Sequence, residues 1–267
     1  MSGSTDTKAL KIAEEIERAH HQGEKFTRLT GELAPLNLEE AYSAQQALQR
    51  LRADGPRGLV GGRKIALASK VQQELCGIDH PIAGAIYQNE IYSTPASLQF
   101  SNYHGLGIEY EIALTLDQDT VMGKHYSQEE VTALVRNIYP AFEMIIDRGA
   151  DYASIDVLTM IADNAWCAGI VLGPDILPML NSGGVTQIND LQTTLRWNSE
   201  TETASTSATD PLGTLTWVVN HLSAVGEQLL AGQPVITGSV MKTRYPAQGD
   251  SVTFSIDGYA EVALSLV

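Results

Sequence analysis

The sequence has few basic residues, few cysteines and no long apolar run, and each shortage excludes a class of protein. Lys and Arg number 17 against 32 Asp and Glu, so the net charge of -15 at pH 7 disfavours nucleic acid and anionic membranes as partners. The two cysteines, Cys76 and Cys167, form no CxxC pair, which favours reduced structural thiols over a disulfide framework. The first residues, Met1 to Lys8, are polar, and no stretch approaches the roughly 18 apolar residues of a membrane span. We therefore expect a cytoplasmic protein that binds neither nucleic acid nor membrane.

A change in sequence texture divides the 267 residues into two parts. Before Gly55, apolar residues recur at helical spacing in two segments, and Asn37 with Glu40 makes a capping-box-like start for the second. From Val60 on, short apolar runs are separated by Gly, Pro, Asn and Asp, which is typical of strands and turns. The sequence thus predicts an N-terminal helical arm over residues 1–58 and a larger domain over residues 59–267.

Within the larger domain, the periodicity of apolar residues alternates between that of strands and that of helices. It predicts strands at 108–116, 141–147 and 167–173, a helix from Ser127 to about Asn137, a short helix at 155–162, a long helix from Asp210 that ends before Gly232, and hairpins around 198–200 and 257–258. Helices do not alternate regularly with strands, so we expect an α+β fold with a strongly curled sheet rather than a doubly wound one.

Two carboxylates share one face of the strand predicted at 108–116. Side chains alternate along a strand, so Glu109 and Glu111 point the same way with Cα atoms about 6.5 to 7 Å apart. Glu143 lies on another predicted strand, and pairing of the two strands would bring in a third carboxylate. Such an oxygen-only set suits Mg²⁺ or Mn²⁺. From spacing alone, the solvated face of an edge strand is the favoured interpretation of Glu109 and Glu111.

Short motifs follow one another along the chain in a specific order. They are Gly62 to Ser69 (GRKIALAS), Gly77 to Pro81 (GIDHP), Ile108 to Ile112 (IEYEI), Phe142-Glu143, Asp163-Asn164, Leu230 to Gly232, Thr237 to Ser239 and Gly249-Asp250. Taken together, they resemble the 2-keto-4-pentenoate hydratase and 4-oxalocrotonate decarboxylase family of the fumarylacetoacetate hydrolase superfamily. The resemblance covers nearly the whole chain beyond the first helix. It implies a curled mixed β-sheet with flanking helices, a homo-oligomer, and a role in aromatic catabolism by meta-cleavage.

The same resemblance assigns roles to residues of the site. It places Glu109, Glu111 and Glu143 at metal-ligand positions, Lys64 and Asp79 at catalytic positions, and Ser69, Asn164 and Ser239 at substrate-binding positions. Without the resemblance, Lys64 would be a strand-end lysine in water, Asp79 a turn former, and Asn164 and Ser239 a cap and a turn residue.

The chain also departs from the family pattern. Ala66 and Ala68 stand where the family has Gly and Thr, and Trp166 stands where Asp-Asn-Ala is commonly followed by Ser. Two interpretations of Trp166 stay open: a core aromatic, or a wall of the pocket that limits the substrate.

These observations predict a metal-dependent lyase that acts on a small 2-oxo or 2-hydroxy-dienoic acid. The main hypothesis is a hydratase that adds water to 2-hydroxypenta-2,4-dienoate and forms a 4-hydroxy-2-oxoacid, with Mg²⁺ or Mn²⁺ as cofactor. The first alternative is a decarboxylase of the 4-oxalocrotonate type, which would need a cationic group for a second carboxylate; Arg63 and Arg148 are the nearest candidates. A carbon–carbon hydrolase and a non-catalytic partner subunit follow.

Overall fold

The computed structural model describes residues 2–180 and 184–267, with side chains from residue 7 onward in the first helix. Its helices are α1 Ser2–His21, α2 Leu38–Ala53, α3 Lys70–Leu75, α4 Gln128–Ala133, α5 Val157–Ala162 and α6 Pro211–Ala224. Short 3-10 turns are η1 Gly31–Leu33, η2 Gln88–Glu90, η3 Phe100–Asn102, η4 Asn164–Trp166, η5 Leu177–Met179, η6 Gly184–Asp190 and η7 Thr206–Ala208. Within the described ranges, no helix has the length and apolar character needed to cross a membrane.

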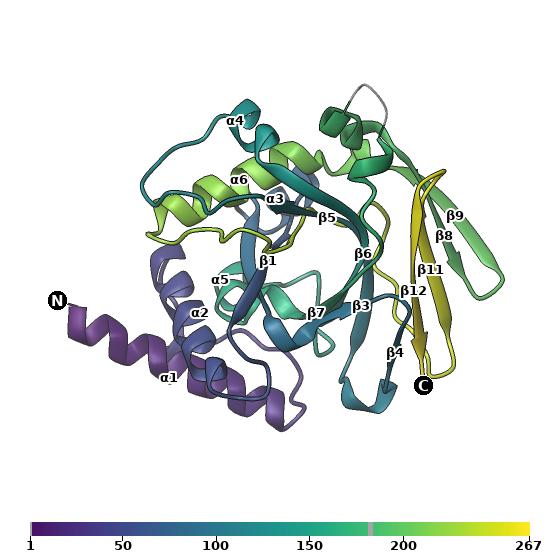
Figure 1. Cartoon of the computed structure of the whole chain (residues 1–267). Coiled ribbons are helices and arrows are strands. Elements are labelled where there is room, and N and C mark those ends of the chain that lie inside the picture. Colours follow the sequence, from purple (N-terminus) through teal and green to yellow (C-terminus); the bar gives the residue numbers. More distant parts are fainter. Residues whose placement is uncertain (1, 181–183) are drawn as a thin grey trace.

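The strands form two sheets, and the larger one curls strongly around the centre of the molecule (Figure 1). In spatial order, the seven-stranded sheet contains β2 Ile82–Tyr87, β1 Val60–Ala66, β10 Val235–Ile236, β5 Leu106–Leu116, β6 Val135–Ile146, β7 Cys167–Leu172 and β3 Ile91–Ser93. The five-stranded sheet contains β4 Ala96–Leu98, β12 Ala260–Leu266, β11 Ser251–Ile256, β8 Gln192–Trp197 and β9 Glu200–Ser205. Parallel and antiparallel pairs both occur, so the predicted α+β fold with a curled mixed sheet is confirmed.

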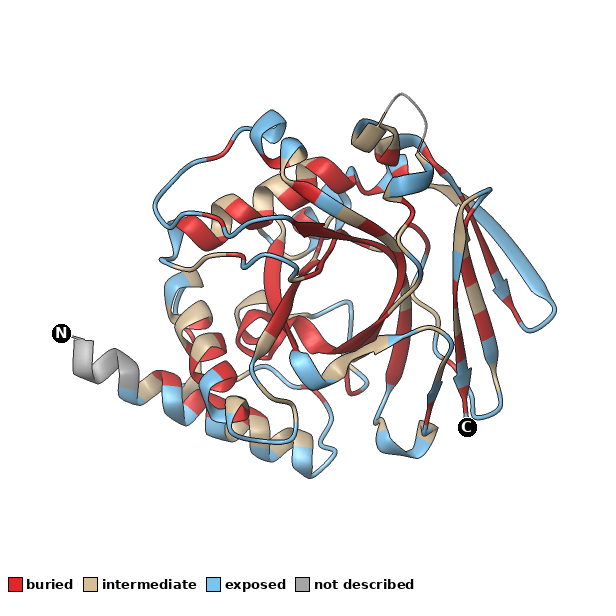
Figure 2. Cartoon of the chain, in the orientation of Figure 1, coloured by how far each residue is buried: buried red, intermediate tan, exposed pale blue. Residues whose placement is uncertain are grey.

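The main core lies between the two sheets. The outward face of β5 carries Tyr110, whose ring lies 6.1 Å from Phe142 of β6 and 6.0 Å from Phe254 of β11. All three rings are buried, and such aromatic groups each remove a large apolar area from water. Figure 2 shows the central strands buried along their length, whereas β9 at the sheet edge is exposed. The opposite face of β5 points into the interior of the curled sheet and carries polar side chains.

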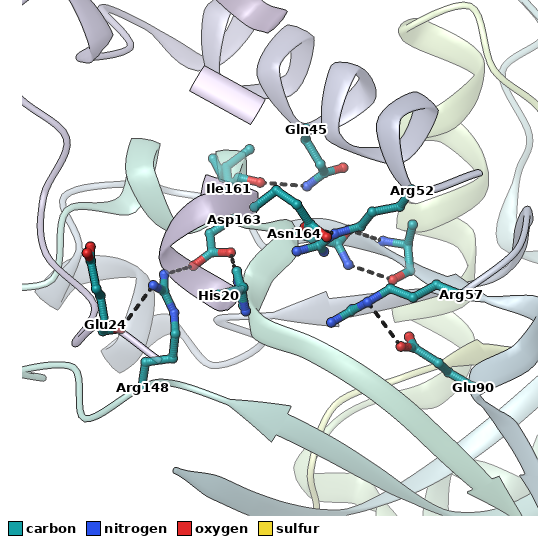
Figure 3. A network of polar contacts seen from close by, with 12 residues as sticks. His20, Glu24, Gln45, Arg52, Arg57, Glu90, Arg148, Ile161, Asp163 and Asn164 are labelled. Atoms are coloured by element: carbon teal, nitrogen blue, oxygen red, sulfur yellow. Dashed lines mark hydrogen bonds and ion pairs between the residues drawn. The ribbon is translucent and has the colours of Figure 1, made fainter. Parts of the chain in front are cut away.

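The first two helices pack on each other and on the body through α5 (Figure 1). A buried polar network reinforces this contact, as Figure 3 shows. Asp163 accepts from Arg148 Nη2 at 2.5 Å and contacts His20 Nε2 of α1 at 2.6 Å. From α2, Gln45 donates to the carbonyls of Ala83 and Ile161, both at 2.8 Å. The arm is therefore tied to the body by buried polar contacts as well as apolar ones, and the boundary at residue 58 stays a prediction.

The boundaries of three elements differ by several residues from the sequence prediction. The helix expected from Ser127 to about Asn137 ends at Ala133, and β6 begins at Val135, six residues before the predicted strand. Pro140 does not precede this strand but lies within it, and the ladder to β7 starts directly after it. The long helix predicted from Asp210 ends at Ala224, because Gly226 adopts a left-handed conformation with φ of 75°.

Candidate active site

A cavity of about 650 Å³ opens on the inner side of the curled sheet. Its wall is formed by β1 and the segment that follows it, by the inner face of β5, by the turn η4, and by residues 238–243. Lys64, Glu109 and Glu111 all line it. The resemblance placed functional side chains on these same segments.

The three predicted metal ligands come together because β5 and β6 pair in one particular register. Glu109 lies directly opposite Glu143 in the antiparallel ladder, and Glu111 lies two residues further along the same face. One carboxylate oxygen from each residue lies within 4.8 Å of the other two. Glu111 and Glu143 are fully buried, and Glu109 is partly buried. The predicted pairing of the two strands is confirmed.

The chemistry of this cluster fits a divalent cation. Glu111 Oε1 and both oxygens of Glu143 have no hydrogen-bond partner among the described residues, although Lys64 Nζ lies 2.9 Å from Glu143 Oε1 as an ion pair. Burial raises the pKa of Glu143 to about 8 even beside Lys64, and burial with the neighbouring carboxylates raises the pKa of Glu111 well above its ordinary value. A hard cation such as Mg²⁺ would use the free oxygens and offset their repulsion.

Two neighbouring groups fix the carboxylates that would hold the ion. The Gly238 N–H donates to Glu111 Oε2 at 2.6 Å, and the Thr243 hydroxyl donates to Glu109 Oε1 at 2.5 Å. Gly238 has φ of 101°, and a Cβ added there would lie 3.0 Å from the Cβ of Ala68. Such outer contacts orient ligands toward a metal. Neither Gly238 nor Thr243 was assigned this role by the sequence.

Lys64 is the only buried cation among the described residues that line the cavity. Its Nζ donates to the Ala165 carbonyl at 3.0 Å, besides its ion pair with Glu143. Although burial disfavours the charged form, the carboxylates of Glu143 and Glu109 raise the pKa of Lys64. The ammonium therefore stays charged and offsets part of the negative charge of the cluster. The alternative of a lysine side chain in water is wrong.

The Ala165 carbonyl reaches Lys64 because the backbone takes an unusual path. Asn164, Ala165 and Trp166 have φ values of 55°, 47° and 62°, a left-handed run that non-glycine residues rarely adopt. Strain of this kind persists only where surrounding contacts hold it, and it concentrates at functional sites. Here the Asn164 side chain supplies one anchor, since it accepts from Ala85 N at 2.7 Å and donates to Ala85 O at 2.8 Å.

The remaining predicted residues fall into two groups. Ser69 and Ser239 line the cavity; Ser69 also caps α3, and Ser239 Oγ accepts from Tyr110 N and donates to Met241 O. Asn164 and Asp79 do not line it: the Asn164 amide is used on β2, and Asp79 lies exposed on the loop after α3. The structure therefore brings six of the eight assigned residues together, while their individual roles stay predictions.

Trp166 is both a core aromatic and part of the cavity wall. Its side chain is buried, and its ring contacts Phe26 of the arm edge-on at 5.0 Å and Tyr152 at 5.8 Å. Next to it the wall is apolar, formed by Ile145, Ile155 and Met160. Trp166 is thus both buried in the core and part of the cavity wall, while a limit on substrate size stays a prediction.

Comparison with known proteins supports the resemblance over nearly the full length. No family model matches the chain. It is 27% identical over 255 residues to 2-keto-4-pentenoate hydratase of Paraburkholderia xenovorans (strain LB400), covering 94% of this chain and 92% of the relative. It is 31% identical over 165 residues to 2-hydroxypent-2,4-dienoate hydratase of Pseudomonas putida, covering 61% of this chain and 72% of the relative. Among solved structures, 4-oxalocrotonate decarboxylase from Pseudomonas putida G7, complexed with magnesium and adipate, superimposes with a TM-score of 0.87 at 22% identity, covering 98% of both chains.

Proposed function

The chain belongs to the hydratase and decarboxylase family of the fumarylacetoacetate hydrolase superfamily, and we propose that it is a divalent-metal-dependent hydratase for 2-hydroxypenta-2,4-dienoate or a close homologue. The product would be the corresponding 4-hydroxy-2-oxoacid. Glu109, Glu111 and Glu143 would hold Mg²⁺, with Mn²⁺ as a substitute. The homo-oligomeric state and the cytoplasmic location stay predictions from the sequence.

The observation that carries this proposal is the distribution of cations around the cavity. Among the described lining residues, the only cations are Lys64, which is engaged by Glu143, and Lys242, which is exposed. Arg63 pairs with Glu227 and Arg148 with Asp163, and neither lines the cavity. A second carboxylate on the substrate would thus have no buried cationic partner, which disfavours dicarboxylates such as 4-oxalocrotonate.

The residues of the site suit a substrate with one charged end and one apolar end. When bound, Mg²⁺ would neutralise the substrate carboxylate and stabilise negative charge on the 2-oxygen. The buried ammonium of Lys64 would stabilise the same end of the substrate. Trp166 and its apolar neighbours would contact the hydrocarbon end and exclude bulk water from it.

The other functions from the sequence make different predictions. A decarboxylase would release carbon dioxide from a 2-oxo-3-enedioate, with Lys242 as the one cation left for the second carboxylate among the described lining residues. A hydrolase would cleave a carbon–carbon bond. A non-catalytic partner subunit would bind neither Mg²⁺ nor oxalate, which mimics the chelating end of the substrate.

The test is to mix the purified protein with freshly generated 2-hydroxypenta-2,4-dienoate in the presence of Mg²⁺ or EDTA. Loss of dienol absorbance is followed while the product is identified by NMR. We expect 4-hydroxy-2-oxopentanoate with Mg²⁺, and little with EDTA. Glu143→Gln should abolish this activity because it removes a charged ligand, whereas Glu129→Gln on the exposed surface of α4 should not change it.

Three results would contradict the hydratase. They are turnover that EDTA leaves unchanged, full activity of the Glu143→Gln variant, and carbon dioxide release from 4-oxalocrotonate at a higher kcat/KM than hydration of the dienoate. Binding of oxalate without any turnover would indicate a different substrate for the same site.

A further inference from the structure

Two tyrosines and one aspartate form a closed hydrogen-bonded group beside the cavity. Tyr152 and Tyr245 both donate to Asp147 Oδ2, at 2.9 and 2.7 Å, and their phenol oxygens lie 2.9 Å apart. The other oxygen of Asp147 accepts from the Gly149 N–H at 2.9 Å. Asp147 itself is 3% exposed. Two half-exposed phenols thus share one oxygen of a buried carboxylate.

This group is attached to the same elements as the carboxylate cluster. Asp147 directly follows β6, the strand that carries Glu143. Tyr245 lies two residues after Thr243, which bonds Glu109. Tyr152 lines the cavity and contacts the ring of Trp166 edge-on at 5.8 Å. Tyr152 therefore lines the same cavity as Glu109 and Glu111.

Packing alone does not account for this arrangement. Tyr152 is 54% exposed and Tyr245 is 53% exposed, so water could satisfy both hydroxyls without any protein partner. Instead both hydroxyls converge on one buried oxygen. Burial, together with Tyr245 and Asp147, raises the pKa of Tyr152, so this phenol keeps its proton and is suited to pass a proton on rather than to ionise.

We propose that Tyr152 takes the proton from the water that adds to the substrate, with Asp147 as the proton acceptor behind it and Tyr245 as a positioning residue. This assignment rests on the proposed hydratase function. It involves residues other than Asp79, which the resemblance places at a catalytic position but which does not line the cavity.

The proton balance of the hydration step is closed. After ketonisation the substrate is a 2-oxo-3-enoate, and the water oxygen forms a bond to C4 while one water O–H bond breaks. The phenol oxygen of Tyr152 accepts that proton as its own proton moves to Asp147 Oδ2. The electron pair of the C3–C4 double bond moves toward the 2-oxygen. As the 2-oxo group re-forms, that pair takes one proton from solvent at C3. Asp147 then gives its proton back to the Tyr152 oxygen, which releases a proton to solvent in the cavity, so the net change is the addition of one water molecule.

The test separates ketonisation from hydration by supplying two substrates, 2-hydroxypenta-2,4-dienoate and 2-oxopent-3-enoate, to the Mg²⁺-loaded protein. For Tyr152→Phe we expect kcat for hydration of the enone to fall about 100-fold or more, the range for loss of general acid–base catalysis, with KM little changed. Ketonisation of the dienol should continue and the enone should accumulate. Asp147→Asn should behave in the same way.

Two matched variants complete the design. Tyr245→Phe keeps the Tyr152–Asp147 bond, so hydration should fall about tenfold or less, as expected for one lost positioning hydrogen bond. Tyr259→Phe changes a tyrosine in the turn between β11 and β12, outside the cavity, and should have no effect.

Each outcome decides the question. Wild-type hydration rates for Tyr152→Phe would overturn the assignment and leave the proposed function intact. Equal loss of ketonisation and hydration in a variant that still binds oxalate as the wild type does would also overturn it. If the wild-type protein hydrates neither substrate, the proposed function fails and the assignment fails with it.

Discussion

The buried ion pairs of Asp163 predict a large loss of stability when its charge is removed. The Asp163 side chain is fully buried, contacts His20 of the arm and pairs with Arg148, whose side chain is 6% exposed. Asp163→Asn keeps the side-chain volume but leaves the Arg148 guanidinium buried without a carboxylate. Breaking one partner of a buried pair costs about 3–5 kcal/mol of unfolding free energy. For a chain of this size that corresponds to a fall in Tm of roughly 6–20 °C.

Thermal unfolding followed by circular dichroism measures this effect directly. Asp54→Asn, which makes the same chemical change at an exposed position after α2, serves as the matched control and should shift Tm little. A fall in Tm for Asp163→Asn no larger than that of the control would refute the reasoning. It would mean that the network in Figure 3 contributes geometry rather than stability.

Three further predictions follow from other parts of the structure. Burial opposes ionisation of Asp163, but His20 and Arg148 hold its pKa below the ordinary 3.8. The stability from its charge is therefore present above that pH and lost as the pH falls through the lower folded pKa. The Tm difference between wild type and Asp163→Asn should accordingly shrink as the pH falls below about 4. Gly238→Ala, at φ of 101° beside Ala68, should weaken Mg²⁺ binding about 10-fold or more, as measured by calorimetry. The control Gly123→Ala, also at positive φ but in open space, should leave the Mg²⁺ affinity unchanged. Equal affinities of the two variants would contradict the role of the Gly238 N–H. Phe254→Ala should lower the free energy of unfolding in denaturant by about 3–5 kcal/mol, because the ring fills the core between the sheets. The Mg²⁺ affinity should not change. A loss below about 1 kcal/mol would show that the core collapses into the space left by the ring.

The predictable part of the site is the part that follows from strand periodicity. The alternation at residues 108–116 places Glu109 and Glu111 on one face, because the period of a strand is two residues. A second strand carrying Glu143 was predicted as well, but the register that places Glu143 opposite Glu109 is known only from the ladder.

The unpredictable part involves backbone atoms and loop directions. The Gly238 N–H and the Ala165 carbonyl are groups that nearly every residue has, so no residue type marks them in a sequence. Asp79 and Asn164 lie within the motifs of the resemblance, but the direction of a loop decides whether a side chain faces the cavity. The early start of β6 could not be predicted because a proline usually marks the end of a strand, whereas the ladder between β6 and β5 continues through Pro140.

The segment from Asp163 to Trp166 has a consequence for how independently the parts of this protein can be exchanged. Asp163 holds the arm, the side chain of Asn164 holds β2, the carbonyl of Ala165 holds Lys64, and Trp166 packs against Phe26 of the arm while lining the cavity. Four adjacent residues thus contact the helical arm, the sheet and Lys64, and form part of the cavity wall. Consider a chimera that takes its arm from a relative. We expect it to fold and to turn over substrate only if it also carries the residues of this segment that contact the relative's arm. On this expectation, the helical arm is not a separable module.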